Sequence, residues 1–240
     1  MSVISNFSHR LVEAIYPPLC MGCGAETDAA NGLCPKCWTE TEFIYDLACS
    51  ACGTPLIGEG AGLCEECFSD PPPWDDGVAV AVYGSVSARI TQSLKHGDRL
   101  ELVPKLGDWM ASTTRSLASP NALVIPIPLH WRRLISRRYN QSALLAEHIA
   151  KRLDLEYRPN ALGRATPVVQ QKTMTRPDRM ANQANSFFVK QPEGLKDRHV
   201  ILVDDVMTSG ATLKAACTAL NSAKVKAISI SVFARVAPNL

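Results

Sequence analysis

The sequence predicts an α/β protein in which a parallel β-sheet with flanking helices follows a small cysteine-rich domain. Three observations support this fold class. Short apolar runs alternate with stretches of helical periodicity in the second half of the chain, as in sheets built from strand–helix–strand units. Eight of the nine cysteines lie in the first 70 residues, in four C-x-x-C turns. Acidic and basic residues are also divided unequally along the chain, which indicates two parts of different charge.

Length and composition indicate a globular protein. The 240 residues are enough for one domain of average size and a small second one. Hydrophobic residues make up 46% of the chain, and no apolar run approaches the roughly 20 residues that cross a bilayer. The first sixteen residues lack the features of a secretory signal and instead fit a short amphipathic helix. We therefore predict a cytoplasmic protein without a membrane span.

The net charge of +2 conceals a division of the chain. Residues 1–88 carry two basic residues against twelve acids, a net charge of −10. Residues 89–240 carry twenty-three basic residues against eleven acids, a net charge of +12. The proline run 71–73 is typical of a linker or rigid turn. We therefore predict an N-terminal helix and cysteine domain in residues 1–73, followed by an α/β domain in residues 74–240.

The four C-x-x-C turns predict two structural zinc sites. Ten residues separate the first two turns and eleven separate the last two, so each pair can close around one tetrahedral ion. Disulfides are the competing interpretation, but the missing secretory signal argues against them. Four thiolates leave no open coordination position, so neither ion would be catalytic. The alternative of crossed turns stays open, and the expected ligand sets are Cys20, Cys23, Cys34 and Cys37 for one ion and Cys49, Cys52, Cys64 and Cys67 for the other.

The charge of the cysteine domain argues against nucleic-acid binding by that domain. Each zinc site with four thiolates carries a charge of −2, and residues 37–88 contain no Lys or Arg. A phosphate backbone requires cations on the protein surface. Support of the fold or contact with another protein is the better interpretation of this domain.

Strands and helices alternate through the rest of the chain. Apolar runs predict strands, and helical spacing of apolar residues predicts helices. Residues 129–136 and 158–186 have little periodicity, so we expect loops there. The expected strands are residues 78–83, 122–125, 187–189, 200–203 and 225–233, and the expected helices begin near residues 89, 102, 142 and 212.

Residues 199–212 carry the candidate binding site. The apolar run 200–203 predicts a strand buried on both faces, and two acids follow where open α/β sheets bind ligands. A loop of small residues and a helix start come next, and backbone N–H groups at such a junction bind anions. Carboxylates beside this loop suit a ligand with vicinal hydroxyls, a phosphate and a divalent cation, although the acids could merely cap the helix. The candidate residues are Asp204, Asp205, Thr208, Ser209, Gly210, Ala211 and Thr212.

A second group of candidate residues is basic. Arginine forks suit phosphate oxygens, so we expect these side chains to bind pyrophosphate or DNA phosphates; a solvated basic turn is the alternative. The group consists of Arg132, Arg133, Arg137, Arg138 and Lys95, and the expected loop 158–186 adds Lys172, Arg176 and Arg179.

The combination of motifs resembles the ComF family. In order, they are the cysteine turns, L-K-H-G-D-R, V-I-P-I-P-L-H-x-R-R-x-x-x-R-x-x-N-Q-S and V-D-D-V-x-T-S-G-A-T, and the resemblance spans residues 14–236. The last motif is similar to the 5-phosphoribosyl-1-pyrophosphate (PRPP) motif of type I phosphoribosyltransferases. The resemblance implies a double zinc ribbon joined to a type I phosphoribosyltransferase-like sheet. It also implies that Asp204 and Asp205 hold the ribose hydroxyls of PRPP, with Mg²⁺, while residues 208–212 wrap its 5-phosphate.

The resemblance further implies a role in handling single-stranded DNA during DNA uptake, beside a helicase partner. The charge distribution predicts that such DNA lies on the basic C-terminal domain. Two other functions stay open: an active phosphoribosyltransferase of nucleotide salvage, and a non-catalytic sensor of PRPP or nucleotides. No segment specific for a base is recognisable after the last strand, so the sequence leaves enzymatic activity and the acceptor base undecided.

Overall fold

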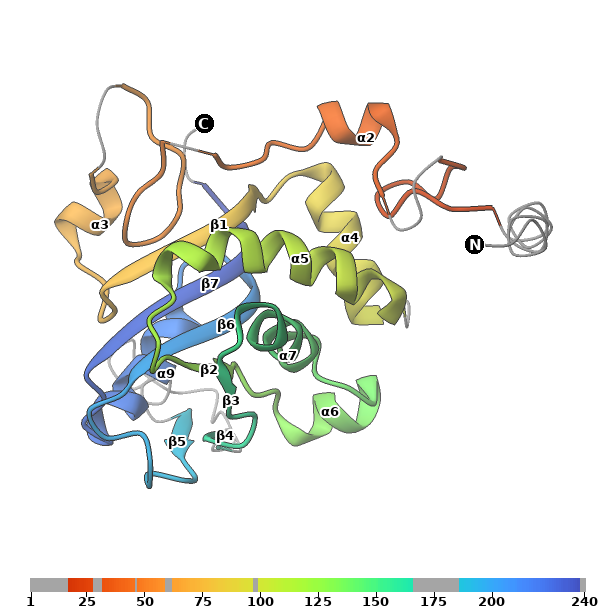
Figure 1. Ribbon diagram of the computed structural model, residues 1–240. Coiled ribbons are helices and arrows are strands. Elements are labelled where there is room, and N and C mark those ends of the chain that lie inside the picture. The colour runs from red at the N-terminus through yellow and green to blue at the C-terminus, as the bar shows by residue number, and fades with distance from the viewer. Residues whose placement is uncertain are drawn as a thin grey trace, which may run out of the picture.

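A five-stranded parallel sheet forms the centre of the molecule, with the strands in the order β1-β7-β6-β2-β3 (Figure 1). The computed structural model describes residues 17–27, 32–45, 47–58, 62–96, 99–165 and 186–237. The parallel pairing of every neighbouring strand confirms the predicted α/β class. The strands are β1 (Asp76–Val82), β2 (Leu123–Pro126), β3 (Glu156–Tyr157), β6 (His199–Met207) and β7 (Ala227–Arg235).

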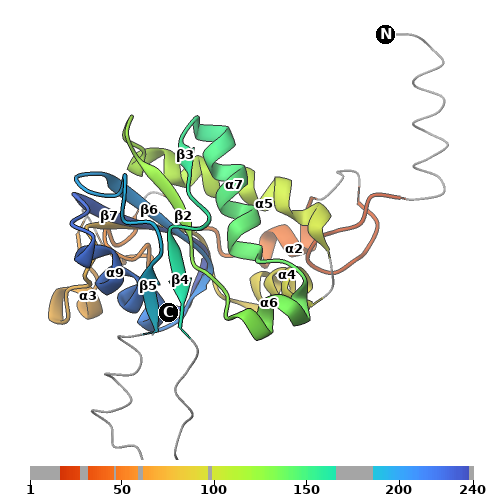
Figure 2. The same cartoon turned by 90° about the horizontal axis from the view of Figure 1, so that it is seen from below.

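Helices cover both faces of the sheet (Figures 1 and 2). Alternate residues of β6 pack into the apolar layers on opposite faces: Val200 and Leu202 into one, Ile201 and Val203 into the other. All four are fully buried, which explains why the strand reads as an unbroken apolar run. One face is covered by α9 (Ala211–Ser222), and the other by α4 (Ser85–His96), α5 (Val103–Thr114) and α7 (Gln141–Leu153). Short 3₁₀ turns, Leu100–Leu102 and Arg115–Leu117, flank α5.

The polar residues of β7 are buried, although their alternation with apolar residues resembles that of a surface strand. β7 lies between β1 and β6, and every residue from 228 to 235 is buried. Ser229 pairs its hydroxyl with His199 Nε2 at 2.9 Å, and Ser231 pairs with the hydroxyl of Thr114 at 2.7 Å. These hydrogen bonds compensate the serines for the loss of water.

Two segments that we expected to be loops contain regular structure. Residues Trp131–Arg137 form helix α6, which begins with the His130 ring accepting the Arg132 N–H at 3.3 Å. None of its side chains is buried, so no apolar periodicity marked it in the sequence. Strand β4 (Leu162–Arg164) pairs antiparallel with β5 (Phe187–Val189) outside the main sheet. Residues 166–185 of the second predicted loop, which include Lys172, Arg176 and Arg179, lie outside the described residues, as does the predicted N-terminal helix.

The cysteine-rich segment runs along the edge of the sheet, with helices α2 (Pro35–Thr39) and α3 (Glu65–Ser69) far apart (Figures 1 and 2). Residues 42–44 between them pair antiparallel with β1: the Val82 N–H donates to Glu42 O and the Ile44 N–H to Val80 O, both at 2.9 Å. This pairing covers an edge strand that would otherwise be open.

The cysteine-rich segment also shares its core with the sheet. Cys49, Ala51 and Cys52 pack in the apolar layer of α9. The N–H of Gly77 in β1 donates to Ser50 O at 2.7 Å. A Cβ on Gly77 would lie 2.2 Å from Ala51 O, so the close approach requires glycine. The boundary between residues 73 and 74 stays a prediction.

No helix in the described ranges is long and apolar enough to cross a membrane.

Candidate functional site

The predicted strand–loop–helix junction is present between β6 and α9. The strand continues through both acids to Met207, rather than ending before them, and a three-residue turn leads into α9. Gly210, the N-cap of α9, has a φ of 71°. A Cβ there would lie 3.1 Å from Met207 Cε and 3.3 Å from Trp74 Cη2. Both conformation and space therefore favour glycine at this position.

A small cavity of about 50 Å³ opens at this junction. The first N–H groups of a helix have no partner within the helix, and together with the helix dipole they attract anions. A compact anion such as a phosphate group fits this environment. The cavity is lined by Asp204 and residues 206–213, which include all five predicted loop residues.

The two acids of β6 have different partners. Asp205 is only 4% exposed, and its Oδ2 lies 2.7 Å from Lys95 Nζ at the end of α4. Asp204 Oδ1 accepts hydrogen bonds from the Ser142 hydroxyl at 2.8 Å and from the Asp205 N–H at 2.9 Å. Burial, followed by repulsion from Asp205, raises the pKa of Asp204 to about 7. Asp204 is therefore poised to exchange a proton or a cation near neutral pH.

The start of α7 brings a residue to the site that we did not predict from the sequence. Asn140 is the N-cap of this helix: its Oδ1 accepts the Ser142 N–H at 3.1 Å, and its Nδ2 donates to Ile127 O at 3.0 Å. Asn140 therefore acts as a helix cap. The cap fixes Ser142, whose hydroxyl then reaches Asp204.

Three of the five predicted basic residues line a second cavity of about 320 Å³. Lys95, Arg133 and Arg137 surround it, together with His96 and Ser136. Lys95 also contacts Asp205, so the basic cavity adjoins the acid pair. Its size and charge suit a polyanion such as pyrophosphate.

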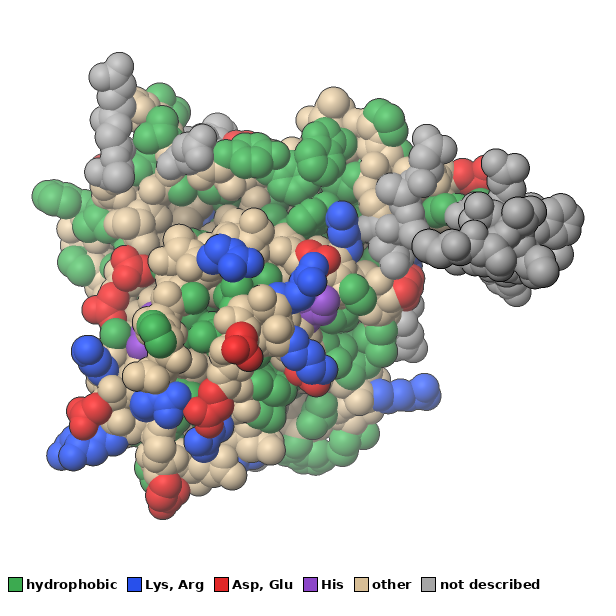
Figure 3. Space-filling view, in the orientation of Figure 1, with side chains coloured by type: hydrophobic (Ala, Val, Ile, Leu, Met, Phe, Trp, Pro, Cys, Tyr) green, Lys and Arg blue, Asp and Glu red, His purple; other side chains and the backbone are tan. Residues whose placement is uncertain are grey.

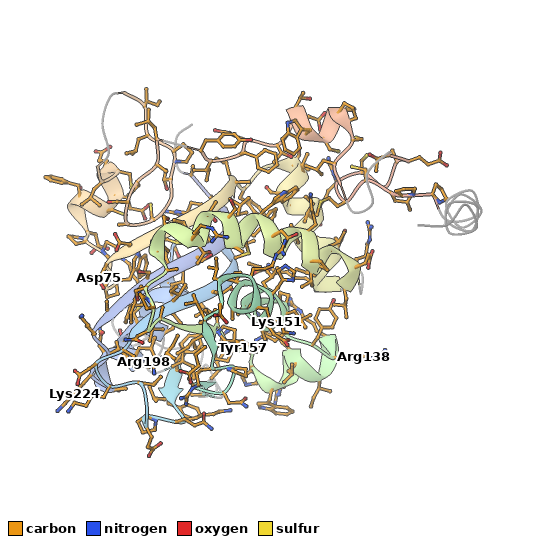
Figure 4. All side chains as sticks on the ribbon, viewed as in Figure 1. Asp75, Arg138, Lys151, Tyr157, Arg198 and Lys224 are labelled. Carbon is orange, nitrogen blue, oxygen red and sulfur yellow. The ribbon has the colours of Figure 1, made fainter. Side chains whose placement is uncertain are left out.

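The other two predicted arginines do not line this cavity. Arg132 is exposed and lies over the Trp131 ring, with 5.3 Å between its guanidinium carbon and the ring centre. Arg138 ends α6 in a left-handed conformation and lies exposed at the outer end of that helix (Figure 4). These two side chains are open to a ligand in solvent, outside the cavity.

Arg164, at the end of β4, is a further cation near the acids that we did not single out from the sequence. Burial and the nearby charge of Arg133 lower its pKa, while Asp204 opposes this. Its guanidinium carbon lies 5.1 Å from the centre of the Phe187 ring. The antiparallel pairing of β4 and β5 brings it there, and nothing in the local sequence indicates that pairing.

The eight N-terminal cysteines form the two expected clusters, and the structure excludes the crossed turns that the sequence left open. In each cluster the four Sγ atoms lie within 4.8 Å of one another. Zinc–sulfur bonds of about 2.3 Å in a tetrahedron require sulfurs about 3.8 Å apart. The pairs Cys23–Cys34 and Cys52–Cys64 are each 3.7 Å apart. Both clusters therefore fit one structural zinc ion each.

Backbone donors support the first cluster as a metal site. The N–H groups of Gly22 and Cys34 donate to Cys20 Sγ at 3.4 and 3.3 Å. Burial alone would raise the pKa of Cys20, but these backbone donors outweigh it and lower the pKa to about 6. A thiolate held by N–H groups is a ready zinc ligand.

The ninth cysteine, Cys217, belongs to neither cluster. It is buried in α9, where burial raises the pKa of its thiol to about 12.

Comparisons with known proteins agree with both parts of the chain. Residues 11–74 match the double zinc ribbon domain, and residues 140–238 match the phosphoribosyl transferase domain. The DNA utilization protein YhgH of Escherichia coli (strain K12) is 30% identical over 204 residues, which cover 82% of this chain and 88% of YhgH. Competence protein F of Haemophilus influenzae is 30% identical over 215 residues, covering 86% of this chain and 92% of its own.

More distant matches are weaker. The competence protein ComFC of Bacillus subtilis is 24% identical over 215 residues, covering 84% of this chain and 82% of its own. Among solved structures, a hypoxanthine phosphoribosyltransferase from Staphylococcus aureus aligns with 55% of this chain and 61% of its own at 14% identity. The TM-score of 0.35 is too low to support an argument.

Loss of one cluster should remove one zinc ion. We expect elemental analysis to find about two zinc ions per chain after purification without chelator, and about one in the Cys64→Ala variant. The melting temperature of that variant should also fall, because the binding energy of a structural zinc is folding energy. Cys217→Ala is the control and should retain about two ions. Less than one zinc ion in the unmodified protein would contradict the assignment.

The raised pKa of Asp204 predicts a pH-dependent gain in stability for Asp204→Asn. A carboxyl whose pKa is higher in the folded state destabilises the fold increasingly from about pH 4 to about pH 7, and by a constant amount above that. Each pKa unit corresponds to about 1.4 kcal/mol, so Asp204→Asn should gain on the order of a few kcal/mol in free energy of unfolding at pH 8. The gain should be smaller at pH 5, as measured by urea denaturation.

Asp108→Asn is the control with the opposite sign. A hydrogen bond from His148, aided by Arg152, lowers the pKa of Asp108, so this carboxylate stabilises the fold above its unfolded pKa. Its replacement should lower stability at pH 8. If Asp204→Asn also loses stability at pH 8, the carboxyl is not held in an unfavourable environment.

Proposed function

This chain belongs to the ComF family, and we propose that it binds PRPP with Mg²⁺ at the junction of β6 and α9. The observation that carries the proposal is the adjacency of three environments: the loop cavity, the acid pair and the basic cavity. PRPP has three matching parts, namely a 5-phosphate, a ribose with vicinal hydroxyls and a pyrophosphate. The match in both order and charge favours this ligand.

Each part of PRPP has proposed contacts. Residues 208–212 hold the 5-phosphate through their N–H and hydroxyl groups. Asp204 and Asp205 accept hydrogen bonds from the ribose hydroxyls, and Lys95, Arg133 and Arg137 bind the pyrophosphate. Mg²⁺, when bound with the ligand, would supply positive charge to the pyrophosphate and so make it a better leaving group.

Lys95 has a special position in this arrangement. It pairs with Asp205 at 2.7 Å and also lines the basic cavity. When pyrophosphate arrives, the ammonium group can turn from the carboxylate to the phosphate oxygens and leave Asp205 free for the ribose.

The alternative function is phosphoribosyltransferase activity in nucleotide salvage. Transfer of the ribosyl group to a base would need the same stabilisation of the leaving group. Incubation with PRPP, Mg²⁺ and a panel of bases, followed by detection of released pyrophosphate, tests it.

The ligand proposal predicts that Asp204→Asn and Asp205→Asn weaken binding of PRPP with Mg²⁺. A hydrogen bond to a charged group contributes about 1.5–3 kcal/mol, so isothermal titration calorimetry should show roughly ten-fold to hundred-fold lower affinity. Asp108→Asn, an acid outside the site, should leave the affinity unchanged. Because Asp204→Asn is expected to stabilise the fold, its loss of affinity could not be attributed to unfolding. Unchanged affinity in both site variants would overturn the assignment.

We propose further that the protein handles single-stranded DNA on its basic C-terminal domain. The names of two relatives refer to competence and to the use of DNA. On the α5 and α7 face, Lys and Arg side chains alternate with Asp and Glu (Figure 3). Helix α6 and its C-cap differ, because they carry four arginines and no acid. Half-exposed Trp131 lies beside them, and aromatic rings can stack on unpaired bases.

We propose the cytoplasm as the cellular setting of this protein. Its reducing conditions would keep the eight cysteines of the two clusters reduced and free to bind zinc. The acidic ribbon is available for contact with a protein partner, and a helicase of the DNA-uptake machinery is the partner that the family suggests. A sensor that binds PRPP without catalysis is compatible with the same site.

The DNA proposal predicts salt-dependent binding of the full chain to a fluorescent oligonucleotide. Each phosphate contact contributes about 0.7 to the slope of log affinity against log salt. Arg133→Gln/Arg137→Gln should lower both the affinity and the slope in fluorescence anisotropy at two salt concentrations. Lys151→Gln is the control, since Lys151 lies on α7 away from α6 and pairs with Glu147 (Figure 4). PRPP should compete with DNA for these two arginines; an equal effect of the two variants would argue against α6.

A further inference from the structure

Arg235 is a buried arginine beneath the candidate phosphate loop. It ends strand β7 and is only 2% exposed. Its Nη1 donates to the carbonyl oxygens of Thr208 and, at 2.8 Å, of Val236. Its Nη2 donates to Glu66 Oε2 at 2.9 Å. Neither the PRPP proposal nor the resemblance to known families assigns a role to this side chain.

The bond to Thr208 determines the direction of the next peptide group. In a trans peptide the carbonyl and the N–H point in opposite directions, and no peptide bond among the described residues is cis. Arg235 draws Thr208 O toward the core, so the Ser209 N–H of the same peptide plane points away from the guanidinium. An N–H with that orientation in the loop is a donor for a bound anion.

Arg235 also connects the loop to the second cysteine cluster. Glu66 lies between Cys64 and Cys67 in the sequence, and its carboxylate pairs with the guanidinium. A second connection runs through Trp74, whose Nε1 donates to Ala51 O at 2.6 Å and whose ring lies against Gly210. Two separate contacts thus join this cluster to the loop.

We infer that Arg235 is a positioning residue for phosphate binding, which orients the 208–209 peptide without touching the ligand and is anchored by Glu66 to the second cluster. The inference rests on the proposed binding of a sugar phosphate by residues 208–212. The second zinc ribbon would then have a structural role at the site, because Glu66 and Trp74 connect it to the loop.

The charges around Arg235 explain why a cation is needed there. Glu66 carries a negative charge, and the neighbouring zinc site with four thiolates carries −2. Without the guanidinium, a phosphate in the loop would face this negative charge unscreened. Glu66→Gln removes one negative charge and keeps an acceptor oxygen for Nη2, so it should preserve or improve phosphate binding. A purely structural ion pair would instead require both partners.

The test is calorimetric titration of the zinc-loaded full chain with ribose 5-phosphate, which probes the loop without the pyrophosphate site. Arg235→Met should weaken binding at least ten-fold, and Arg235→Lys should restore part of it, because lysine keeps the charge and one donor. Glu66→Gln should bind as tightly as the unmodified protein or more tightly. Lys214→Met is the matched control: it removes the Lys214–Asp70 pair between α9 and the residue following α3 and should change the affinity less than two-fold.

Hydrogen exchange of the loop amides, measured by mass spectrometry without ligand, separates this inference from the proposed function. Arg235→Met should accelerate exchange in the segment 208–212, whereas Lys214→Met should not. If the unmodified protein does not bind ribose 5-phosphate, the proposed function fails, and the exchange result still decides whether Arg235 holds the loop. Unchanged exchange in Arg235→Met, or equal losses of affinity in Arg235→Met and Glu66→Gln, would overturn the inference. If Arg235→Met does not fold, the Arg235→Lys and Glu66→Gln pair decides in the same way.

Discussion

The placement of two adjacent carboxylates at the end of β6, Asp205 buried and Asp204 half-buried, is the constraint on which the site depends. A buried charge requires a partner, and here the partners come from different helices: Lys95 from the end of α4 and Ser142 from the start of α7. The helices on one face of the sheet are therefore tied to the end of its central strand. These partners do not fully offset burial and the repulsion between the two carboxylates, so the pKa of Asp204 is raised. This carboxyl can therefore accept a cation or a hydroxyl donor.

The zinc ribbon acts as part of the scaffold of the α/β domain. Its backbone pairs with the edge strand β1, and its cysteines pack in the same apolar layers as the sheet. The two clusters have different neighbours: the first packs with α4 and α5, while the second reaches the loop through Glu66 and Trp74. An acidic domain without cations between residues 37 and 88 is thereby connected to the proposed anion site.

The arginines of α6 were predicted from the sequence as one group, but the structure separates them. Four arginines within seven positions predicted a phosphate-binding surface, but residues 131–137 form a helix in which Arg133 and Arg137 line a cavity and Arg132 does not. Helical geometry separates neighbours in the sequence onto different faces. Arg164 shows the opposite case, because residues distant in the sequence are brought together. It lies near Asp204 only because β4 pairs with β5, where its partner is Phe187.

The sequence by itself determined the features whose causes are local. The C-x-x-C spacing predicted two cysteine clusters, although only the structure excluded crossed turns. The apolar run, acid pair and glycine loop determined the junction of β6 and α9, because each operates within a few dozen residues. Only the tertiary structure decided the partners of these groups. The Lys95–Asp205 and Glu66–Arg235 pairs join residues more than 100 positions apart, so they depend on the order of the strands. No local sequence pattern marks Arg235, because its proposed role depends on Thr208 and Glu66, which only the fold brings to it.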